Sequence, residues 1–352
     1  MPTSFSASKI GKLDRNKFEL IAGGYTAFQL FWAGVRLGLF NQISQKPGSR
    51  MEAIQGSLDL ESKPARILLT GLVALGLVEK RGDAYFNSEM VEENAIDGKE
   101  GSLTPLYEWY ARINYPALFD FVDSLKENRN VGLRHFPGSG ATLYERLASN
   151  SDLQSVFQRA MSVLSRRTNP ALLDAFDFGE IKQILDVGGG DGTNTITLAR
   201  RFPVLHATVF DIPSVCEMAK GKIKQAGLEN RIKVHPGNFL KDPFPKGSDG
   251  VMFNHILPIW SETRNRDLLR KCHRALPAGG VVFIFNMITK EDEIGPVTPA
   301  FGSMYFLTLA TGEGMLYTWD DYTAWLKEAG FTRIRRVGNL PLDHGLLIAE
   351  KR

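Results

Sequence analysis

Short apolar runs alternate with longer amphipathic stretches over the second half of the chain. Stretches with helical spacing end near residue 201 and cover 214–226, 262–275 and 319–329, and the apolar runs lie at 184–187, 207–210, 232–234, 250–254, 281–286, 333–337 and 345–351. This alternation is typical of a parallel, doubly wound sheet. Only a short segment around Pro341 separates the last two runs, so we expect them to form an antiparallel hairpin. The predicted fold class is α/β, a Rossmann-like doubly wound sheet with an antiparallel final hairpin.

Helical spacing dominates the first 100 residues. A Leu-rich helical stretch near 65–72 is followed by an apolar run at 75–80, a Gly-Asp turn and a second short run, which is the order of a winged helix. The candidate recognition helix carries Lys63 and Arg66 but is otherwise apolar, which favours packing over entry into a DNA groove. We therefore predict three segments: an N-terminal all-α, winged-helix-like dimerisation domain (1–100), a helical linker contributing to a substrate pocket (101–175) and a catalytic domain (176–352).

A glycine-rich turn stands between the first of these sheet strands and the helix that follows it. Glycines at 188–190 permit positive φ and let a ligand approach bare backbone, and the helix that follows offers unpaired N–H groups. Asp211 ends the next apolar run, where a strand-end carboxylate can bind a ribose hydroxyl pair. Asp186 and Asp191 flank the glycines, and their charges would repel a pyrophosphate. The pattern indicates a cationic nucleoside without phosphates, such as S-adenosylmethionine.

Composition restricts the other classes of function. The net charge of +3 includes no basic block, so we expect no nucleic-acid partner. Two cysteines in 352 residues favour a reducing compartment. No apolar run approaches the ~18–20 residues that span a membrane, and the N-terminus lacks a signal pattern. We expect a cytoplasmic protein without membrane insertion, and the absence of metal-ligand spacing predicts no metal site.

Several motifs together resemble the class I S-adenosylmethionine-dependent methyltransferases, and within them the small-molecule O-methyltransferase family of plant caffeate, hydroxyindole and bacterial antibiotic- and pigment-tailoring enzymes. The resemblance implies that Gly188 and Gly190 line the methionine part of the cofactor and that Asp211 binds the ribose. It places Asn238, where the family usually has Asp, and Phe239 beside the adenine. The motifs that carry the resemblance lie at 185–192 (LDVGGGDG), 210–213 (FDIP), 237–239 (GNF) and 276–280 (LPAGG). We also assign Asp186 and Asn254, the last residue of its strand, to the cofactor site.

One departure from the family pattern changes the expected chemistry. The family usually has a Leu-His-Asp-Trp motif after the fourth strand, and its histidine removes the phenol proton. With Trp260 aligned to the family tryptophan, Pro258 stands at the place of that histidine and has no titratable group. Asn286 replaces the first acid that orients the base, and residues 314–317 lack an obvious second. These three losses favour an acceptor that needs no such base: a ring carbon, a nitrogen or an acidic oxygen.

Other side chains are candidates for the missing base and for the pocket. His255, directly after a strand, and the hydroxyls of Tyr305 and Tyr317 are the candidate catalytic groups, whereas His344 is expected to be structural or solvated. His135, His206, His235 and His273 have no evident partners in the sequence. Large, weakly polar pocket residues predict a flat, mostly apolar acceptor rather than a sugar or an amino acid. The candidate wall residues are Tyr107, Tyr110, Phe157, Met161, Trp260, Phe301 and Met304, together with Tyr305.

These observations predict a homodimeric S-adenosylmethionine-dependent methyltransferase that acts on an aromatic or polycyclic natural product or pigment. Two alternatives stay open at this stage. The first is an enzyme that keeps the cofactor but performs a cyclisation, a decarboxylation or a hydroxylation. The second, which the apolar recognition helix disfavours, is a winged-helix regulator that binds DNA.

Overall fold

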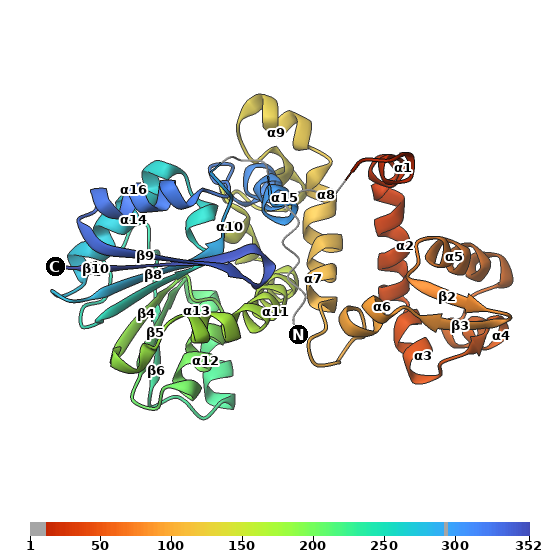
Figure 1. Cartoon of the computed structure of the whole chain (residues 1–352), viewed down its shortest axis with the longest axis horizontal. Coiled ribbons are helices and arrows are strands. Elements are labelled where there is room, and N and C mark those ends of the chain that lie inside the picture. Colours follow the sequence, from red (N-terminus) through yellow and green to blue (C-terminus); the bar gives the residue numbers. More distant parts are fainter. Residues whose placement is uncertain (1–11, 292–294) are drawn as a thin grey trace. The chain divides into compact units, whose positions relative to one another are not determined.

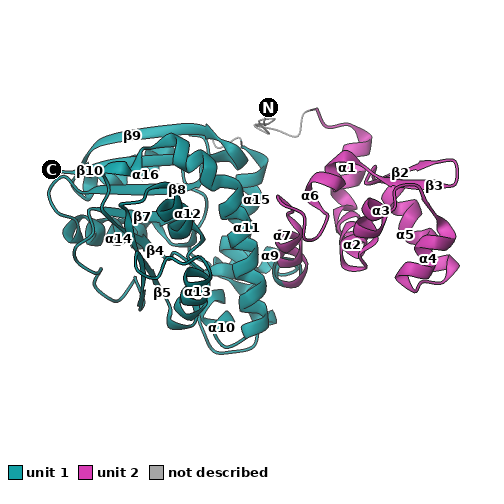
Figure 2. Cartoon of the chain, turned by 90° about the horizontal axis from the view of Figure 1, so that it is seen from below, with its two compact units in different colours: residues 1–10, 113–352 teal, residues 11–112 magenta. Residues whose placement is uncertain are grey.

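The computed structural model describes residues 12–291 and 295–352. Within them the chain forms two compact units, one ending at Arg112 and the other running from Ile113 to Arg352 (Figure 2). The division falls inside the segment 101–175 that the sequence predicts as one linker. Its first residues thus belong with the N-terminal unit and the rest with the sheet.

The N-terminal unit is mainly helical and contains a small sheet. Its core is formed by residues of α3, α5 and β2, and Tyr107 of α7 packs against that core. The predicted helix, strand, turn and strand of the wing are present as α5, β2 and β3, so the unit is not wholly helical; the three strands pair in the order β1-β3-β2. The elements are α1 (Arg15–Ala22), α2 (Gly24–Arg36), α3 (Leu39–Gln45), β1 (Ser49–Arg50), α4 (Met51–Leu58), α5 (Ser62–Ala74), β2 (Val78–Arg81), β3 (Ala84–Asn87), α6 (Glu89–Asn94) and α7 (Thr104–Trp109).

A helical segment precedes the sheet in the second unit. It ends with the long helix α11, whose first turn is capped by the Asn150 side chain accepting from the Leu153 N–H. The segment comprises a π-turn (Tyr110–Asn114) that begins at the end of the first unit, α8 (Tyr115–Leu118), α9 (Phe121–Glu127), a 3₁₀ turn (Val131–His135), α10 (Leu143–Leu147), α11 (Ser151–Ala175) and a 3₁₀ turn (Phe178–Glu180).

The remaining residues form the predicted α/β sheet. Seven strands lie in the order β6-β5-β4-β7-β8-β10-β9. The first five are parallel to one another, and β10 runs antiparallel to both β8 and β9, which confirms the predicted final hairpin. The elements are β4 (Gln183–Val187), α12 (Thr193–Arg201), β5 (His206–Asp211), α13 (Pro213–Gln225), β6 (Ile232–Pro236), β7 (Gly250–Asn254), a 3₁₀ turn (Leu257–Ile259), α14 (Glu262–Ala275), β8 (Val281–Met287), α15 (Val297–Tyr305), a π-turn (Phe306–Ala310), α16 (Trp319–Glu328), β9 (Phe331–Leu340), a 3₁₀ turn (Pro341–Asp343) and β10 (His344–Lys351).

Apolar side chains cover both faces of the sheet. Helices α12 and α13 lie on one face, and α14 and α16 lie on the other (Figure 1). Successive residues of a strand point to opposite faces. The α12–α13 face therefore buries Ile184, Val209, Met252 and Phe283, whereas the α14–α16 face buries Leu185, Phe210, Phe253 and Ile284. No helix of the described residues is long and apolar enough to cross a lipid bilayer.

The turn after β7 is fixed by close backbone contact with the segment before α16. The Thr311 hydroxyl donates to the Ile259 carbonyl at 2.5 Å. Gly314 is buried beside the same turn, and a Cβ at Gly314 would lie 2.1 Å from the carbonyl oxygen of Pro258. Residues 314–317, the segment in which the sequence analysis finds no second acid, therefore begin in close contact with the turn that carries Pro258.

This contact predicts that Gly314→Ala lowers the free energy of unfolding by about 1 to 3 kcal/mol, because backbone must shift to admit the methyl group. Gly221→Ala is the matched control: Gly221 lies inside α13, a Cβ there meets no heavy atom within 4 Å, and alanine favours a helix. Thermal unfolding of both variants tests this. Equal melting temperatures for Gly314→Ala and the parent would contradict the close packing.

Candidate functional site

Three polar side chains meet at the carboxyl edge of the sheet. They are Asp186 on β4, Asp211 at the end of β5 and Asn254 at the end of β7. Each lies two positions after a residue that is buried on the α12–α13 face, so strand alternation puts all three on that face. β4 has β5 and β7 as its neighbours. This is the edge and the switch point where open α/β sheets bind ligands.

The glycine-rich turn exposes backbone at the same edge. Gly188 has φ 69° and Gly190 has φ 60°, which a residue with a side chain rarely adopts. The Gly188 N–H donates to the Phe210 carbonyl at 2.8 Å. A Cβ at Gly188 would lie 2.3 Å from the end of the Ile256 side chain, so a larger residue would require Ile256 to move in addition to the strain of the positive φ. The predicted role of these glycines in a close backbone approach is consistent with this geometry.

Asp186 is buried without compensation. It has no exposed surface, and within residues 12–291 and 295–352 neither carboxylate oxygen has a hydrogen-bond partner. Burial, and secondarily the neighbouring Asp211, raises the pKa of the Asp186 carboxyl to about 8. Both amide atoms of Asn254 are likewise buried without a described partner. Buried polar groups are normally hydrogen-bonded. The unpartnered oxygens of Asp186 and Asn254 therefore indicate a ligand that brings hydrogen-bond donors and positive charge.

Asp211 is held by backbone N–H groups. Its Oδ2 accepts from the Gly190 N–H at 2.9 Å and its Oδ1 from the Ile212 N–H at 2.8 Å. Burial raises the pKa of the Asp211 carboxyl to about 6, and these two N–H groups oppose the rise. Each carboxylate oxygen has a further lone pair. The carboxylate is therefore fixed in orientation and has lone pairs left to accept hydrogen bonds, and its contact with a ribose diol stays a prediction.

Asn238 is fixed in orientation by the backbone. Its Oδ1 accepts from the Leu240 N–H at 3.0 Å, which leaves the second lone pair of this oxygen and the amide N–H groups for the predicted adenine contact. The Phe239 ring lies edge-on to both Phe210 and Trp260, with centroids 6.4 Å and 6.2 Å away. It is half-buried, which suits a ring that packs against a nucleobase.

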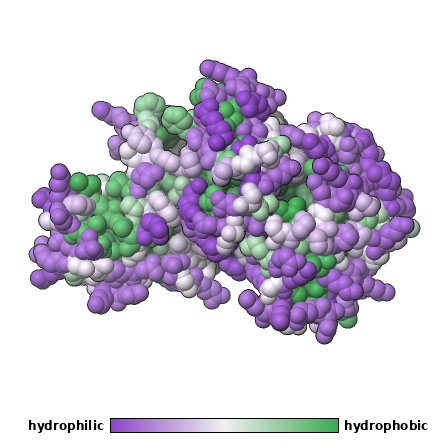
Figure 3. Space-filling model, turned by 180° about the vertical axis from the view of Figure 1, so that it is seen from behind, coloured by the Kyte–Doolittle hydropathy of each residue, from purple (hydrophilic) through white to green (hydrophobic). Residues whose placement is uncertain are grey.

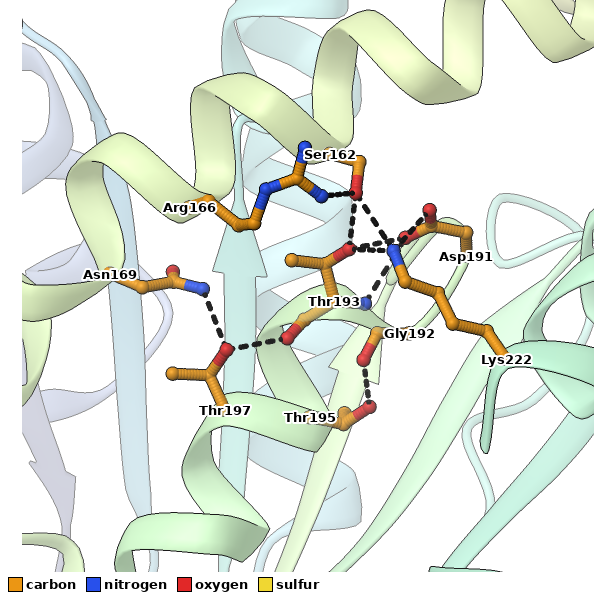
Figure 4. A network of polar contacts seen from close by, with 9 residues as sticks. All are labelled: Ser162, Arg166, Asn169, Asp191, Gly192, Thr193, Thr195, Thr197 and Lys222. Atoms are coloured by element: carbon orange, nitrogen blue, oxygen red, sulfur yellow. Dashed lines mark hydrogen bonds and ion pairs between the residues drawn. The ribbon is translucent and has the colours of Figure 1, made fainter. Parts of the chain in front are cut away.

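A polar network ties the glycine-rich turn to α11 and α13 (Figure 4). The Lys222 ammonium donates to the Asp191 carboxylate at 2.7 Å and to the Ser162 hydroxyl at 2.8 Å. Ser162 also contacts the Thr193 hydroxyl at 2.7 Å and accepts from Arg166 at 2.9 Å. Asp191 is thus paired with a lysine, which the sequence did not indicate, and Arg166 joins the network although it was expected on a solvated face. The network stabilises the turn and includes Asp191 but not Asp186, whose carboxyl group has no hydrogen-bond partner among the described residues.

His255 and His344 form a pair at the same edge. Their Nε2 atoms lie 2.6 Å apart, and the His344 Nδ1 lies 2.9 Å from the Leu342 carbonyl. Burial and the neighbouring His344 lower the pKa of His255 well below its usual value; burial lowers the pKa of His344 to about 4. His344 is buried, so the expected alternative that it is solvated is wrong, whereas the expected structural role is not contradicted.

The two candidate tyrosines have different surroundings. The Tyr317 hydroxyl donates to the Trp260 carbonyl at 2.7 Å, which gives it a structural role in the turn after β7. The Tyr305 hydroxyl lies 3.4 Å from that of Tyr144, and burial raises the pKa of both phenols well above the usual value. At neutral pH Tyr305 is a hydrogen-bond donor rather than a base. Tyr144, which the sequence did not single out, is its partner.

The predicted pocket residues are only partly brought together. Phe157 packs edge-on against Tyr144, with centroids 5.7 Å apart, and so joins the Tyr144–Tyr305 pair. Trp260 is buried beside Phe239. Met161 and Met304 are half-buried and Phe301 is 64% exposed, so their place in a pocket stays a prediction. Tyr107 packs edge-on against Phe31 and Tyr110 lies next to Tyr107, both within the N-terminal unit.

One further cluster was missed. The Asp120 carboxylate is almost fully buried and contacts both Arg134 and His135, whose Nε2 lies 2.9 Å from it. Sequence analysis found no partner for His135, because Asp120 lies 15 positions away and no local spacing links the two. Among the residues that the structure describes, no group of three or more His, Cys, Asp or Glu is arranged to hold a metal ion.

Comparisons with known proteins find similar sequences and a similar fold. A profile of the O-methyltransferase domain matches residues 117–332. L-tyrosine C(3)-methyltransferase of Streptomyces lavendulae is 38% identical over 346 residues, which cover 96% of this chain and 93% of that protein. The 3-hydroxy-5-methyl-1-naphthoate 3-O-methyltransferase of Streptomyces sahachiroi is 32% identical over 90% of this chain and 89% of its own. The apo crystal structure of the S-adenosylmethionine-dependent methyltransferase SibL superposes with a TM-score of 0.80, at 37% identity, over 96% of this chain and 99% of that one.

The unpaired Asp186 carboxyl predicts that cofactor binding is linked to a proton. With a pKa of about 8 it is protonated at pH 7 in the free enzyme, and a bound ammonium or sulfonium favours its ionised form. Calorimetry of S-adenosylmethionine binding at pH 7 should detect proton release, and affinity should rise as pH rises from 6 to 8. Asp186→Asn should lose this linkage and bind about tenfold to a hundredfold more weakly.

The same variant has an opposite effect on the free protein. The folded-state pKa lies above the ~4 of an unfolded Asp, so the parent loses stability as pH rises from about 4 to 8, and Asp186→Asn avoids that loss. Its melting temperature at pH 8 should equal or exceed that of the parent. The exposed Asp174→Asn on α11 is the control and should leave binding unchanged. Proton-independent binding by the parent would contradict the account.

Proposed function

This chain belongs to the O-methyltransferase domain family and is an S-adenosylmethionine-dependent methyltransferase, and from that premise we propose that it methylates a ring carbon of a phenolic substrate. The observation that carries the proposal is Pro258. It stands where the family's general base is expected, inside a buried 3₁₀ turn, and cannot accept a proton. An acceptor that must first lose an O–H proton is poorly served by this arrangement.

The proposed cofactor site consists of the residues described above. S-adenosylmethionine supplies an electrophilic methyl group when bound. Asp186 and Asn254 would face its positively charged part, and Asp211 its ribose. Gly188 and Gly190 would permit its close approach, and Asn238 and Phe239 would flank the adenine. Positioning of the acceptor in line with the methyl group is then the main contribution of the protein.

Carbon methylation places little demand on a base. The ring carbon attacks with a π electron pair of the phenol, so no proton need leave beforehand. The methylated ring then carries a proton that is strongly acidic, because its loss restores aromaticity. A neutral imidazole with a lowered pKa accepts such a proton but is a weak base toward a phenol, whose pKa is ~10. His255 has these properties and is the proposed proton acceptor.

The names of the relatives support a substrate class, and one of them changes the expectation about amino acids. The relative that is 38% identical acts on L-tyrosine according to its name. The expectation that amino acids are excluded, which rested on apolar pocket residues alone, is therefore withdrawn. We propose a phenolic aromatic with a free position ortho to the hydroxyl, with L-tyrosine as the first substrate to test. Neither a non-methylating reaction nor DNA binding is favoured, since the relatives are named methyltransferases.

Transfer to oxygen is the second candidate. The family profile and the relative that is 32% identical are both named for O-methyl transfer. An acidic phenol or enol that is already ionised would need no base, so Pro258 does not exclude such an acceptor. The position of the new methyl group in the product separates the two candidates.

Incubation with methyl-labelled S-adenosylmethionine and L-tyrosine, tyramine or a naphthol, followed by carbon NMR of the product, tests the proposal. We expect an aryl methyl signal rather than a methoxy signal. Pro258→His should not raise kcat, because the ring proton has its own acceptor. A methoxy product, or a large gain in kcat on restoring the histidine, would select O-methylation.

We also propose a homodimer. The helix α1 has no buried residue, and hydrophobic patches lie among mostly hydrophilic residues on the face drawn in Figure 3. Exposed apolar patches of this kind usually mark protein contacts. Phe18, Leu20, Ile21 and Tyr25 are more than half exposed in the N-terminal unit, as are Phe119, Val122 and Leu125 on and before α9. Light scattering should give twice the mass of 39.2 kDa, and a monomer at micromolar concentration would contradict this.

A further inference from the structure

The pairing of His255 with His344 determines which ring nitrogens carry protons. The His344 Nδ1 lies 2.9 Å from the Leu342 carbonyl and 3.1 Å from that of Pro341. A carbonyl only accepts, so this Nδ1 carries the proton. A neutral His344 must then present a bare Nε2, and a contact of 2.6 Å with the His255 Nε2 requires the proton on His255. His255 is left with Nδ1 as its unprotonated nitrogen.

Both rings are neutral and shielded from other charges. Low pKa values keep the two imidazoles uncharged at pH 7, which the tautomer assignment requires. The Phe285 ring packs against both histidines, with centroids 6.0 Å from His255 and 5.0 Å from His344. In the described part of the chain, the hydrogen bonds of the two rings are the mutual one and those to the two carbonyls. No carboxylate competes for the His255 proton.

The pair stands at the ligand-binding edge of the sheet. His255 follows β7 directly and donates its backbone N–H to the Phe285 carbonyl of β8. His344 begins β10, which runs antiparallel to β8 and therefore starts at the carboxyl edge. His255 has φ 59°, an uncommon conformation outside glycine that tends to persist at functional sites. The fold holds this side chain in a strained but defined place.

We propose that His344 is the positioning residue of this enzyme: it binds the Nε2–H of His255 and so leaves Nδ1 of His255 as the atom that receives the ring proton. This inference rests on the proposed carbon methylation. In that reaction the new C–C bond forms from the ring π pair as the methyl–sulfur bond breaks with its electrons staying on sulfur. The ring C–H bond then breaks, its proton goes to His255 Nδ1, and its electron pair restores the aromatic ring.

This role differs from the use of an acid to orient the family's usual base. An acid beside an imidazole raises its pKa, whereas a neutral imidazole acceptor fixes the tautomer without adding charge. The expected base is therefore weak, and it is sufficient for an acidic ring proton. The arrangement also explains why the buried His344 has two carbonyl partners, since they hold its own tautomer in turn.

The first test needs no turnover. Nitrogen NMR of the six histidines in the intact enzyme, assigned with His255→Gln and His344→Gln, reports each tautomer. We expect His255 protonated on Nε2 and His344 on Nδ1 at pH 7. A His255 ring protonated on Nδ1, or charged, would overturn the inference whatever reaction the enzyme performs.

The second test uses a phenol deuterated ortho to its hydroxyl. In the parent, where methyl transfer limits the rate, the isotope effect on kcat should be near one. His344→Leu should lower kcat by about tenfold to a hundredfold and raise the isotope effect, because proton removal becomes limiting. Its KM and its affinity for S-adenosylmethionine should stay unchanged. His344→Gln, whose amide oxygen can accept from His255, should retain part of the rate that His344→Leu loses. It also replaces His344→Leu in this test if the leucine variant does not fold.

His206→Leu is the matched control, since His206 is exposed at the amino end of β5 and should leave both readouts unchanged. An unchanged kcat and isotope effect in folded His344→Leu, with a C-methyl product, would overturn this inference alone. A methoxy product would overturn the proposed carbon methylation and with it the ring-proton role of His255.

Discussion

One buried carboxylate, Asp186, and one half-buried carboxylate, Asp211, at the end of a parallel sheet set the constraint on which this structure depends. Asp186 has no hydrogen-bond partner among the described residues, and Asp211 has only backbone donors. Leaving such groups uncompensated is costly, and the cost appears as the raised pKa of both carboxyls. We expect a cationic nucleoside to offset this cost when it binds. We therefore expect the cofactor site to select a positively charged ligand, independently of the contacts with the methyl acceptor.

The rest of the cofactor edge is arranged so that this charge stays available. Lys222 pairs with Asp191, not with Asp186, and the surrounding hydroxyls fix the glycine-rich turn to α11. If Lys222 paired with Asp186 instead, the two charges would cancel, and a bound cation would gain little free energy from the Asp186 carboxylate. The turn after β7 is packed against Gly314, where a Cβ would lie 2.1 Å from the Pro258 carbonyl oxygen.

Much of this was predictable because it depends on local patterns. The glycine-rich turn, the strand ending in Asp211 and the final hairpin follow from spacing within short segments, and the structure has each of them. The contacts that the sequence did not indicate join distant residues: Lys222 with Ser162, Tyr144 with Tyr305, and His255 with His344, which are 60, 161 and 89 positions apart. No periodicity encodes such pairs. They become visible only when the order of strands brings their ends together.

We expect the site to bind a positive charge through Asp186, whose carboxylate has no hydrogen-bond partner among the described residues. Calorimetric titration with S-adenosylhomocysteine and with its deaminated analogue, in which hydrogen replaces the α-ammonium, tests it most directly. We predict that the analogue binds about tenfold to a hundredfold more weakly, because a charge-assisted hydrogen bond is lost at the buried Asp186 carboxylate. Equal affinities for the two ligands would contradict it.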